Sequence, residues 1–216
     1  MKTIPREARR VTYSSKIRVL KTIPFNEVQR AIIAGCVLGD GYLESNWSKT
    51  NYRLNLSHSS EQKEYLLWKI SIFRKWIISE PYYHKGTNSF RARTISHPEL
   101  TLLRQVFYRD GKKTITDGVL KFLNNPQVIA VWFMDDGNVV RTKHDNHIHG
   151  YHLNTQSFSE NENEILKCAL NKIYGLKCTV QNNHGYCRIF IRAQSREKFR
   201  TIIGGFIVPS MRYKLG

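Results

Sequence analysis

IAGCVLGDG at residues 33–41 and IAVWFMDDG at residues 129–137 are the two stretches that decide the fold. Each is an apolar run of helical character that ends in an acidic residue followed by glycine. The two aspartates, Asp40 and Asp136, lie 96 positions apart in a chain of 216 residues. A single copy would fit an ordinary helix end. Because such a pattern is unlikely to recur by chance, the repetition indicates a duplicated chain with two equivalent halves.

The acidic ends of these two runs have a chemical implication. A helix carries partial negative charge at its C-terminus, where a carboxylate is disfavoured and a cation is preferred. Something positive should therefore compensate Asp40 and Asp136, and a divalent metal held by carboxylate and carbonyl oxygens is the natural candidate. We expect Gly41 and Gly137 to let the chain leave each helix through a positive φ angle.

The charge balance indicates a polyanionic partner. Thirty-four Lys and Arg residues against seventeen Asp and Glu give a formal net charge of +17, in a chain with 41% hydrophobic residues. Such a composition is typical of a folded nucleic-acid-binding protein. No run approaches the ~18 apolar residues that a membrane-spanning helix requires, so we expect no membrane partner.

The histidines and cysteines do not form a convincing metal site. His144, His147, His149 and His152 fall where we expect a polar β-hairpin, and solvated or phosphate-contacting histidines are the favoured interpretation over metal ligands. The four cysteines show no C-x-x-C pairing, which favours buried free thiols in a reducing compartment. The N-terminus lacks the apolar core of a secretory signal, while its Arg content and single acid do not exclude an organellar presequence. The cytoplasm of a prokaryote and an organelle both remain open as locations.

The order of patterns predicts an α+β fold with pseudo-twofold symmetry. In each half a helix, two strands, a helix, two strands and a helix follow one another, and matched landmarks are offset by 96 to 101 residues. We assign residues 1–25 to a basic N-terminal arm, 26–118 to the first repeat and 119–216 to the second. Asn26, Ser60 and Ser159 are expected helix N-caps, and Gly175 a helix stop. The small residues Gly35 and Gly39 should allow close packing of a partner helix.

Polar residues on the outward faces of the strands are the candidate DNA contacts. They are Arg, Lys, Asn and Gln with almost no acid, and such side chains can read base edges when a β-ribbon enters the major groove. For any single arginine, a solvated strand face is an equally good interpretation. The candidates are Arg53, Asn55, Ser57, Arg91, Arg93, Arg141, Lys143, His152, Asn154, Gln156, Lys177, Thr179, Gln181, Arg188 and Arg192.

Four segments together resemble one known family. These are WFMDDG within the second run, LNTQSF at residues 153–158, KKTI at 112–115 and MRYKL at 211–215. From about Pro24 onwards the chain resembles the LAGLIDADG homing endonucleases, and most closely their monomeric, two-motif, intron-encoded type. The resemblance implies two repeats around a central two-helix interface, with antiparallel sheets that form a saddle over double-stranded DNA. It also implies Mg²⁺, with two or more ions in the active centre.

The resemblance supplies the remaining active-site candidates. Asp40 and Asp136 would meet on the symmetry axis and bind metal, with Gly39 and Asp135 beside them as further ligands. Lys113 and Lys214 resemble the lysines that approach the family's active centre, where they could polarise water, stabilise phosphate charge or only clamp phosphate. Lys112 is an alternative to Lys113, and Gln156 or Ser57 could organise water.

Three functions stay open on this reading. The first is a metal-dependent, site-specific endonuclease that makes a double-strand break in a long DNA target. The second is an RNA maturase that assists splicing of its host intron and uses the same basic surface. The third is a catalytically silent DNA-binding regulator, which intact acids at both positions disfavour.

Overall fold

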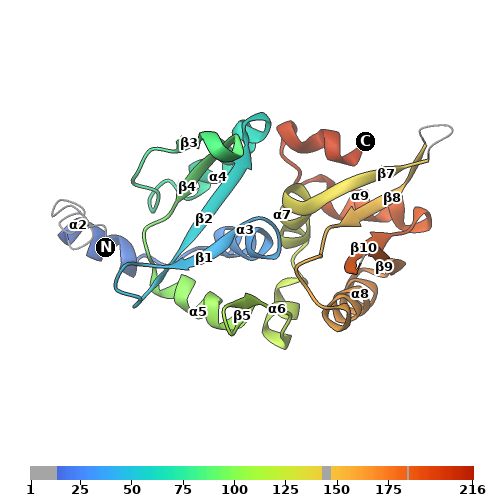
Figure 1. The fold of residues 1–216 in the computed structure, drawn as a ribbon, viewed down its shortest axis with the longest axis horizontal. Helices are drawn as coiled ribbons and strands as arrows, with labels where there is room; N and C mark the ends of the chain where they lie inside the picture. The colour runs from blue at the N-terminus through green and yellow to red at the C-terminus, as the bar shows by residue number, and fades with distance from the viewer. Residues whose placement is uncertain (1–13, 143–146, 184) are drawn as a thin grey trace.

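The computed structural model describes residues 14–142, 147–183 and 185–216, and its two halves repeat one order of elements (Figure 1). The first half contains α3 (Glu27–Leu38), β1 (Tyr42–Ser45), β2 (Tyr52–Ser59), α4 (Lys63–Ile72), β3 (Tyr82–His84), β4 (Ser89–Arg93) and α5 (Pro98–Phe107). The second contains α7 (Pro126–Asp136), β7 (Gly137–Arg141), β8 (Ile148–Leu153), α8 (Glu160–Tyr174), β9 (Cys178–Asn183), β10 (Tyr186–Ile191) and α9 (Arg196–Gly204). The predicted α+β order of helix, strands, helix, strands, helix is confirmed.

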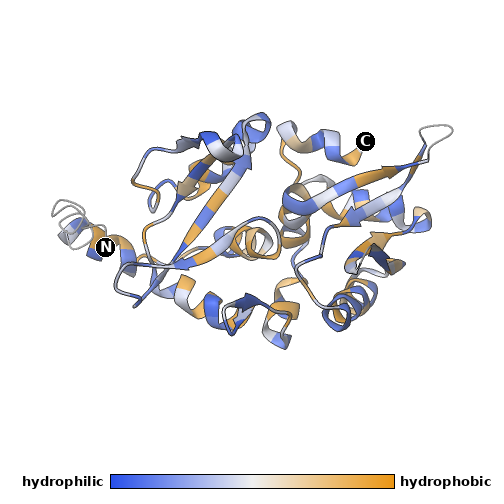
Figure 2. Ribbon diagram, in the orientation of Figure 1, coloured by the Kyte–Doolittle hydropathy of each residue, from blue (hydrophilic) through white to orange (hydrophobic). Residues whose placement is uncertain are grey.

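Each half builds a four-stranded antiparallel sheet of the same topology. The strand order is β1-β2-β4-β3 in the first sheet and β7-β8-β10-β9 in the second. The two sheets lie on either side of the central helices α3 and α7 (Figure 1). Figure 2 shows apolar residues on these helices and an alternation of apolar and polar residues along β2. One face of each sheet therefore packs on the core, and the other is left for a partner.

The central helices pack closely because α3 offers glycines to α7. A Cβ atom built on Gly35 would lie 2.6 Å from the Cβ atom of Val131, and one on Gly39 would lie 2.5 Å from that of Asp135. Both distances are far below a normal carbon contact. The helices meet with small residues on one side only, so the contact between the two signature segments is close but not symmetric.

The glycines that follow the two acids serve a different purpose from the one expected. Neither Gly41 nor Gly137 has a positive φ angle, and Gly137 is extended with φ −92°. A side chain is excluded at both positions because too little space is available. A Cβ atom on Gly41 would lie 2.9 Å from the carbonyl oxygen of Cys36, and one on Gly137 would lie 2.5 Å from that of Phe133. The prediction of a positive φ angle is wrong, and the glycines allow the chain to turn tightly against the helix it has just left.

Local capping follows the sequence at three of the four predicted positions. Asn26 and Ser159 each form a capping box at the start of α3 and α8, and Gly175 ends α8 with φ 61°. Ser60 does not cap a helix, because a short 3-10 turn (Ser60–Gln62) precedes α4. The second-half strand β8 ends at Leu153, so Asn154 and Gln156, which were expected on a strand, lie beyond it.

Three of the short elements carry or adjoin the site. β5 (Tyr108–Arg109) and β6 (Lys112–Lys113) form a small hairpin, and a 3-10 helix, η4 (Pro209–Leu215), ends the chain. The predicted boundary between residues 118 and 119 falls inside α6 (Asp117–Phe122), and the predicted arm includes α2 (Ser15–Thr22). In α2, Ile17 is buried, and the backbone carbonyl of Leu20 accepts a hydrogen bond from the Trp76 indole at 3.1 Å. The three-part division remains a prediction.

Two further findings concern exposure and membranes. All four cysteines are free, but Cys168 is exposed, so the expectation of buried thiols is wrong for this residue because it lies on the outward face of α8. Within the described ranges, no helix is long and apolar enough to cross a membrane.

Candidate active site and DNA-binding surface

The ends of α3 and α7 bring the two predicted acids together. Asp136 is the last residue of α7, and Asp40 follows α3 by two residues. Their carboxyl groups lie close enough for each to affect the pKa of the other. Two like charges this near repel each other, so protonation of one carboxyl group is favoured where no cation lies beside them.

The pKa values of these carboxyl groups express the same repulsion. Partial burial, the Asp40 carboxylate and the Asp135 carboxylate raise the pKa of Asp136 to about 7. Partial burial and the Asp135 carboxylate likewise raise the pKa of Asp40. A divalent cation beside the pair would relieve this repulsion and favour the ionised forms.

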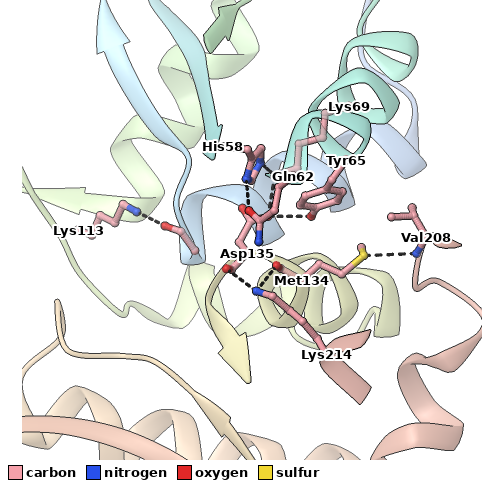
Figure 3. Close-up of polar contacts among 10 residues, drawn as sticks. His58, Gln62, Tyr65, Lys69, Lys113, Met134, Asp135, Val208 and Lys214 are labelled. Carbon is pink, nitrogen blue, oxygen red and sulfur yellow. Dashed lines mark hydrogen bonds and ion pairs between the residues drawn. The ribbon is translucent and has the colours of Figure 1, made fainter. Parts of the chain in front are cut away.

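The two predicted lysines approach the helix ends from different kinds of element, a strand in the first half and a 3-10 helix in the second. Lys113 of β6 donates from Nζ to the Gly39 carbonyl oxygen at 2.6 Å. Lys214 of η4 donates from Nζ to the carbonyl oxygens of Met134 at 2.6 Å and Asp135 at 2.9 Å (Figure 3). Each ammonium group therefore meets the negative end of a helix dipole. Burial lowers the pKa of both lysines, while the neighbouring aspartates oppose that shift.

Asp135 is placed differently from its neighbour Asp136. Its side chain is buried and accepts hydrogen bonds at Oδ1 from Lys69 Nζ at 2.6 Å and from the Tyr65 hydroxyl at 2.7 Å. The carboxylate is thus directed into the first half, and its metal contact could come only from the other oxygen or from the backbone. The carbonyl oxygens of Gly39 and Asp135 already accept from the two lysines, although each retains a second lone pair. The assignment of Gly39 and Asp135 as metal ligands remains a prediction.

The donor atoms at the helix ends suit a hard divalent cation. They are carboxylate and carbonyl oxygens, which Mg²⁺, Ca²⁺ and Mn²⁺ prefer. Among residues 14–142, 147–183 and 185–216, no group of three or more His, Cys, Asp or Glu side chains is placed to hold a metal ion. Two carboxylates with open positions fit a cation that keeps water and phosphate oxygens in its shell, as Mg²⁺ does in nucleotide sites.

In the first sheet, the predicted contacts share one face. Arg53, Asn55 and Ser57 alternate along β2 with buried residues, Asn55 pairs with Arg93, and Ser57 pairs with Arg91. These five side chains therefore lie on the face away from the core.

The sequence did not reveal an acid on that same face. Glu44 of β1 accepts from the Arg53 guanidinium at 2.7 Å and from the Asn55 amide at 3.2 Å. An isolated strand pattern gives no cross-strand partner, and only the register of β1 against β2 reveals this one.

In the second sheet, the same face is less uniformly polar. Thr179 and Gln181 of β9 pair with Phe190 and Arg188 of β10. His152 pairs with the same Phe190, is only 6% exposed and contacts the Gln181 amide oxygen at 3.0 Å through Nε2. The expectation of a solvated His152 is therefore wrong, because Gln181 and Phe190 cover it.

The remaining predicted contacts lie at strand ends or beyond them. Lys177 and Arg192 are exposed and flank the β9–β10 pair, where the Arg192 amide donates to the Lys177 carbonyl oxygen at 3.0 Å. Asn154 and Gln156 follow β8, and Asn154 donates to the Asn138 side chain at 3.1 Å. Arg141 ends β7. Lys143 and His144 lie outside the described residues. Of the other candidates for the active centre, Lys112 is exposed, and Ser57 donates to Ser89 within the sheet at 3.4 Å.

Comparison with known proteins identifies the fold's relatives. The model of the LAGLIDADG DNA endonuclease family matches residues 30–199. The chain belongs to this family. The probable intron-encoded endonuclease 1 of Wickerhamomyces canadensis is 30% identical over 202 residues, which cover 88% of this chain and 84% of that protein. The DNA endonuclease I-ChuI of Chlamydomonas applanata is 28% identical over 208 residues, which cover 87% and 94% respectively.

A solved structure extends the likeness to three dimensions. The homing endonuclease I-WcaI bound to its DNA recognition sequence matches with a TM-score of 0.84 at 26% identity, over 94% of this chain and 93% of that one. The resemblance seen in the sequence is confirmed. In this LAGLIDADG chain the two signature motifs form α3 and α7, and Asp40 and Asp136 at their ends lie close enough to affect each other's pKa.

Proposed function

We propose that this chain is a site-specific homing endonuclease that makes a Mg²⁺-dependent double-strand break in a long DNA target. The observation that carries the proposal is that the Asp40 and Asp136 carboxyl groups, at the ends of two helices that lie between two sheets, are close enough to shift each other's pKa. A net charge of +17 supplies the attraction for a polyanion. The family and its relatives, which include a homing endonuclease bound to DNA, support the same conclusion.

The sheets would bind the DNA and set its register. Their outer faces present Arg, Asn, Gln and Thr side chains in cross-strand pairs, as at Asn55–Arg93 and Gln181–Arg188. Arg and Asn or Gln can each form two hydrogen bonds to guanine and adenine edges. Two sheets with one topology would follow the groove over successive segments, which suits a long target. The central helices would then lie beneath the middle of the bound duplex.

The helix ends would carry out the hydrolysis. Asp40 and Asp136 would hold the divalent ions, which when bound neutralise the charge that develops on the scissile phosphate and on the leaving 3′ oxygen. Lys113 and Lys214 add positive charge on the two sides of the pair and fix the carbonyl groups at the helix ends. Because the Asp136 carboxyl group has a pKa of about 7, it would ionise fully only above that pH or when a cation is bound beside it.

A cleavage assay tests this function against the alternatives. The protein is incubated with Mg²⁺ and a randomised duplex DNA library, and in parallel with a group I intron precursor RNA. An endonuclease produces defined double-strand ends with short 3′ overhangs from a small set of sequences. Splicing of the RNA without DNA cleavage would instead identify a maturase, and selective DNA binding without either reaction would identify a regulator.

A further inference from the structure

A fully buried ion pair joins the two halves at the residue that precedes Asp136. Lys69 of α4 and Asp135 of α7 are in contact at 2.6 Å, and both side chains are 0% exposed. Figure 3 shows them between the first-half helix and the end of α7, with Tyr65 donating to the same carboxylate. One partner comes from each half, so the pair spans the pseudo-twofold axis.

The pair breaks the symmetry of the duplicated chain. With the offset of 96 that relates the two acids, Asp135 corresponds to Gly39, and a Cβ atom on Gly39 would lie 2.5 Å from the Cβ atom of Asp135. Only one of the two positions can therefore carry a side chain. An offset of 100, which aligns Leu66 of α4 with Leu166 of α8, places Ala169 opposite Lys69. The Lys69–Asp135 pair therefore has no equivalent at the matching positions, Ala169 and Gly39.

A chain of hydrogen bonds connects the pair to the segment that carries Lys214. Lys69 Nζ donates to His58 Nε2 at 2.9 Å, which leaves the His58 proton on Nδ1 facing the Gln62 amide oxygen at 3.3 Å. Gln62 in turn donates to the Tyr213 hydroxyl at 3.0 Å. Burial and the Lys69 charge lower the pKa of His58 to about 4, so that it stays neutral in this chain. Tyr213 precedes Lys214, whose ammonium group donates back to the Asp135 carbonyl oxygen.

Stability alone gives little reason for such an arrangement. Burying two charges removes their hydration, and apolar residues of similar volume often stabilise a protein as well as a buried ion pair does. A charged pair with added hydrogen bonds is, however, more directional than apolar packing. Here the pair fixes Asp135, which directly precedes Asp136 and whose carbonyl oxygen accepts a hydrogen bond from Lys214.

We propose that Lys69 and Asp135 are positioning residues. Their ion pair, with the hydrogen-bond chain that runs from it through His58 and Gln62 to Tyr213, fixes the end of α7 against the first half and so sets where Asp136 and Lys214 lie relative to Asp40. This inference rests on the proposed endonuclease function. Neither side chain needs to touch DNA. A displacement of reacting groups by about 1 Å can slow an enzyme by about 10²-fold, so a small change at the pair would reach the chemistry.

The test separates cleavage from folding and binding. The double variant Lys69→Met, Asp135→Asn removes both charges, keeps the shape of the Asp135 side chain and shortens the Lys69 side chain by one atom, so that neither partner is left as an unpaired buried charge. The wild type is first shown to cleave its library-selected target. Single-turnover cleavage on saturating prebound DNA, the Kd in EDTA and the melting temperature are then measured for both proteins. The control is Lys167→Met, Glu164→Gln, which removes a partly exposed ion pair on α8.

The expected result is a split between these readouts. The double variant should melt near the wild-type temperature and keep the wild-type Kd, but its cleavage rate should fall at least about tenfold. The α8 control should keep all three. Cleavage by the double variant at the wild-type rate would overturn the inference, whereas a wild type that cuts no DNA would overturn the proposed function instead.

A second variant decides the matter should the double variant not fold. Gln62→Met breaks the link between His58 and Tyr213 at a half-buried site and leaves the ion pair intact. A reduced cleavage rate at unchanged Kd and melting temperature supports the positioning role. An unchanged rate contradicts it.

Discussion

Replacing Gly35 with alanine tests the close contact between α3 and α7 on which the shared active site depends. The added Cβ atom would lie 2.6 Å from the Cβ atom of Val131 and 2.7 Å from the Val128 carbonyl oxygen. Carbon atoms normally approach no closer than about 3.5 Å. Because one obstacle is backbone, it cannot rotate aside, and the helices must separate by up to roughly 1 Å.

The expected loss of stability is the difference between two effects. Overpacking a core costs about 1–3 kcal/mol, and a rigid obstacle places this substitution near the upper end. Alanine recovers about 1 kcal/mol of helix propensity relative to glycine. The net loss is therefore about 1–2 kcal/mol, which corresponds to a fall in melting temperature of roughly 2–8 °C for a chain of this size. The same displacement should slow single-turnover cleavage by up to about 10²-fold.

The control substitution is Gly204→Ala in α9. A Cβ atom there meets nothing within 4 Å, and the residue does not have a positive φ angle. Its melting temperature should stay unchanged or rise slightly, because alanine favours the helix, and its cleavage rate should match the wild type. Thermal denaturation and single-turnover cleavage measure both variants. A Gly35→Ala protein as stable and as active as the Gly204→Ala protein would refute the close helix contact.

Three further predictions concern charge at the site and on the sheets. In EDTA, folded Asp136 holds its proton up to a pH of about 7, whereas the unfolded chain releases it near the ordinary value of 3.8. The melting temperature should therefore fall as pH rises between these values, and more steeply in the wild type than in Asp136→Asn. Equal slopes in the two proteins would show that the pKa of Asp136 is not raised. Lys113→Met and Lys214→Met should each slow cleavage of prebound DNA by about 10-fold or more while the Kd changes little, because each removes a charge beside the acids. Unchanged rates in both variants would show that the two lysines only bind phosphate. If Arg91 reads a guanine, Arg91→Ala should weaken DNA binding by ~1–3 kcal/mol in a way that depends on the base at that position. The measurement is competition with single-base variants of the target. An equal loss of affinity for all variants would show a phosphate contact instead.

The sequence was sufficient wherever a local pattern carries the information. The repeated acidic helix ends placed Asp40 and Asp136 together, since a duplicated chain implies an axis on which equivalent points meet. The capping boxes at Asn26 and Ser159 also follow from four consecutive residues, and the family motifs identified Lys113 and Lys214.

The features that the sequence could not reveal depend on register or on contacts between distant segments. Glu44 pairs with Arg53 only because of the strand register, and His152 is covered by Gln181 from another strand. Nothing in the sequence around Lys69 distinguishes it from an exposed helical lysine, although it is buried against Asp135 sixty-six positions away. A buried lysine has no local signature, because its partner is supplied by the fold.

The central claim is that Asp40 and Asp136 together cut both strands of DNA. The most direct measurement follows conversion of a supercoiled plasmid carrying the selected target in Mg²⁺, for the wild type, Asp40→Asn and Asp136→Asn. We expect linear product from the wild type, essentially none from either variant, and Kd values in EDTA that stay close to the wild type. Linear product formed at the wild-type rate by either variant would contradict this claim.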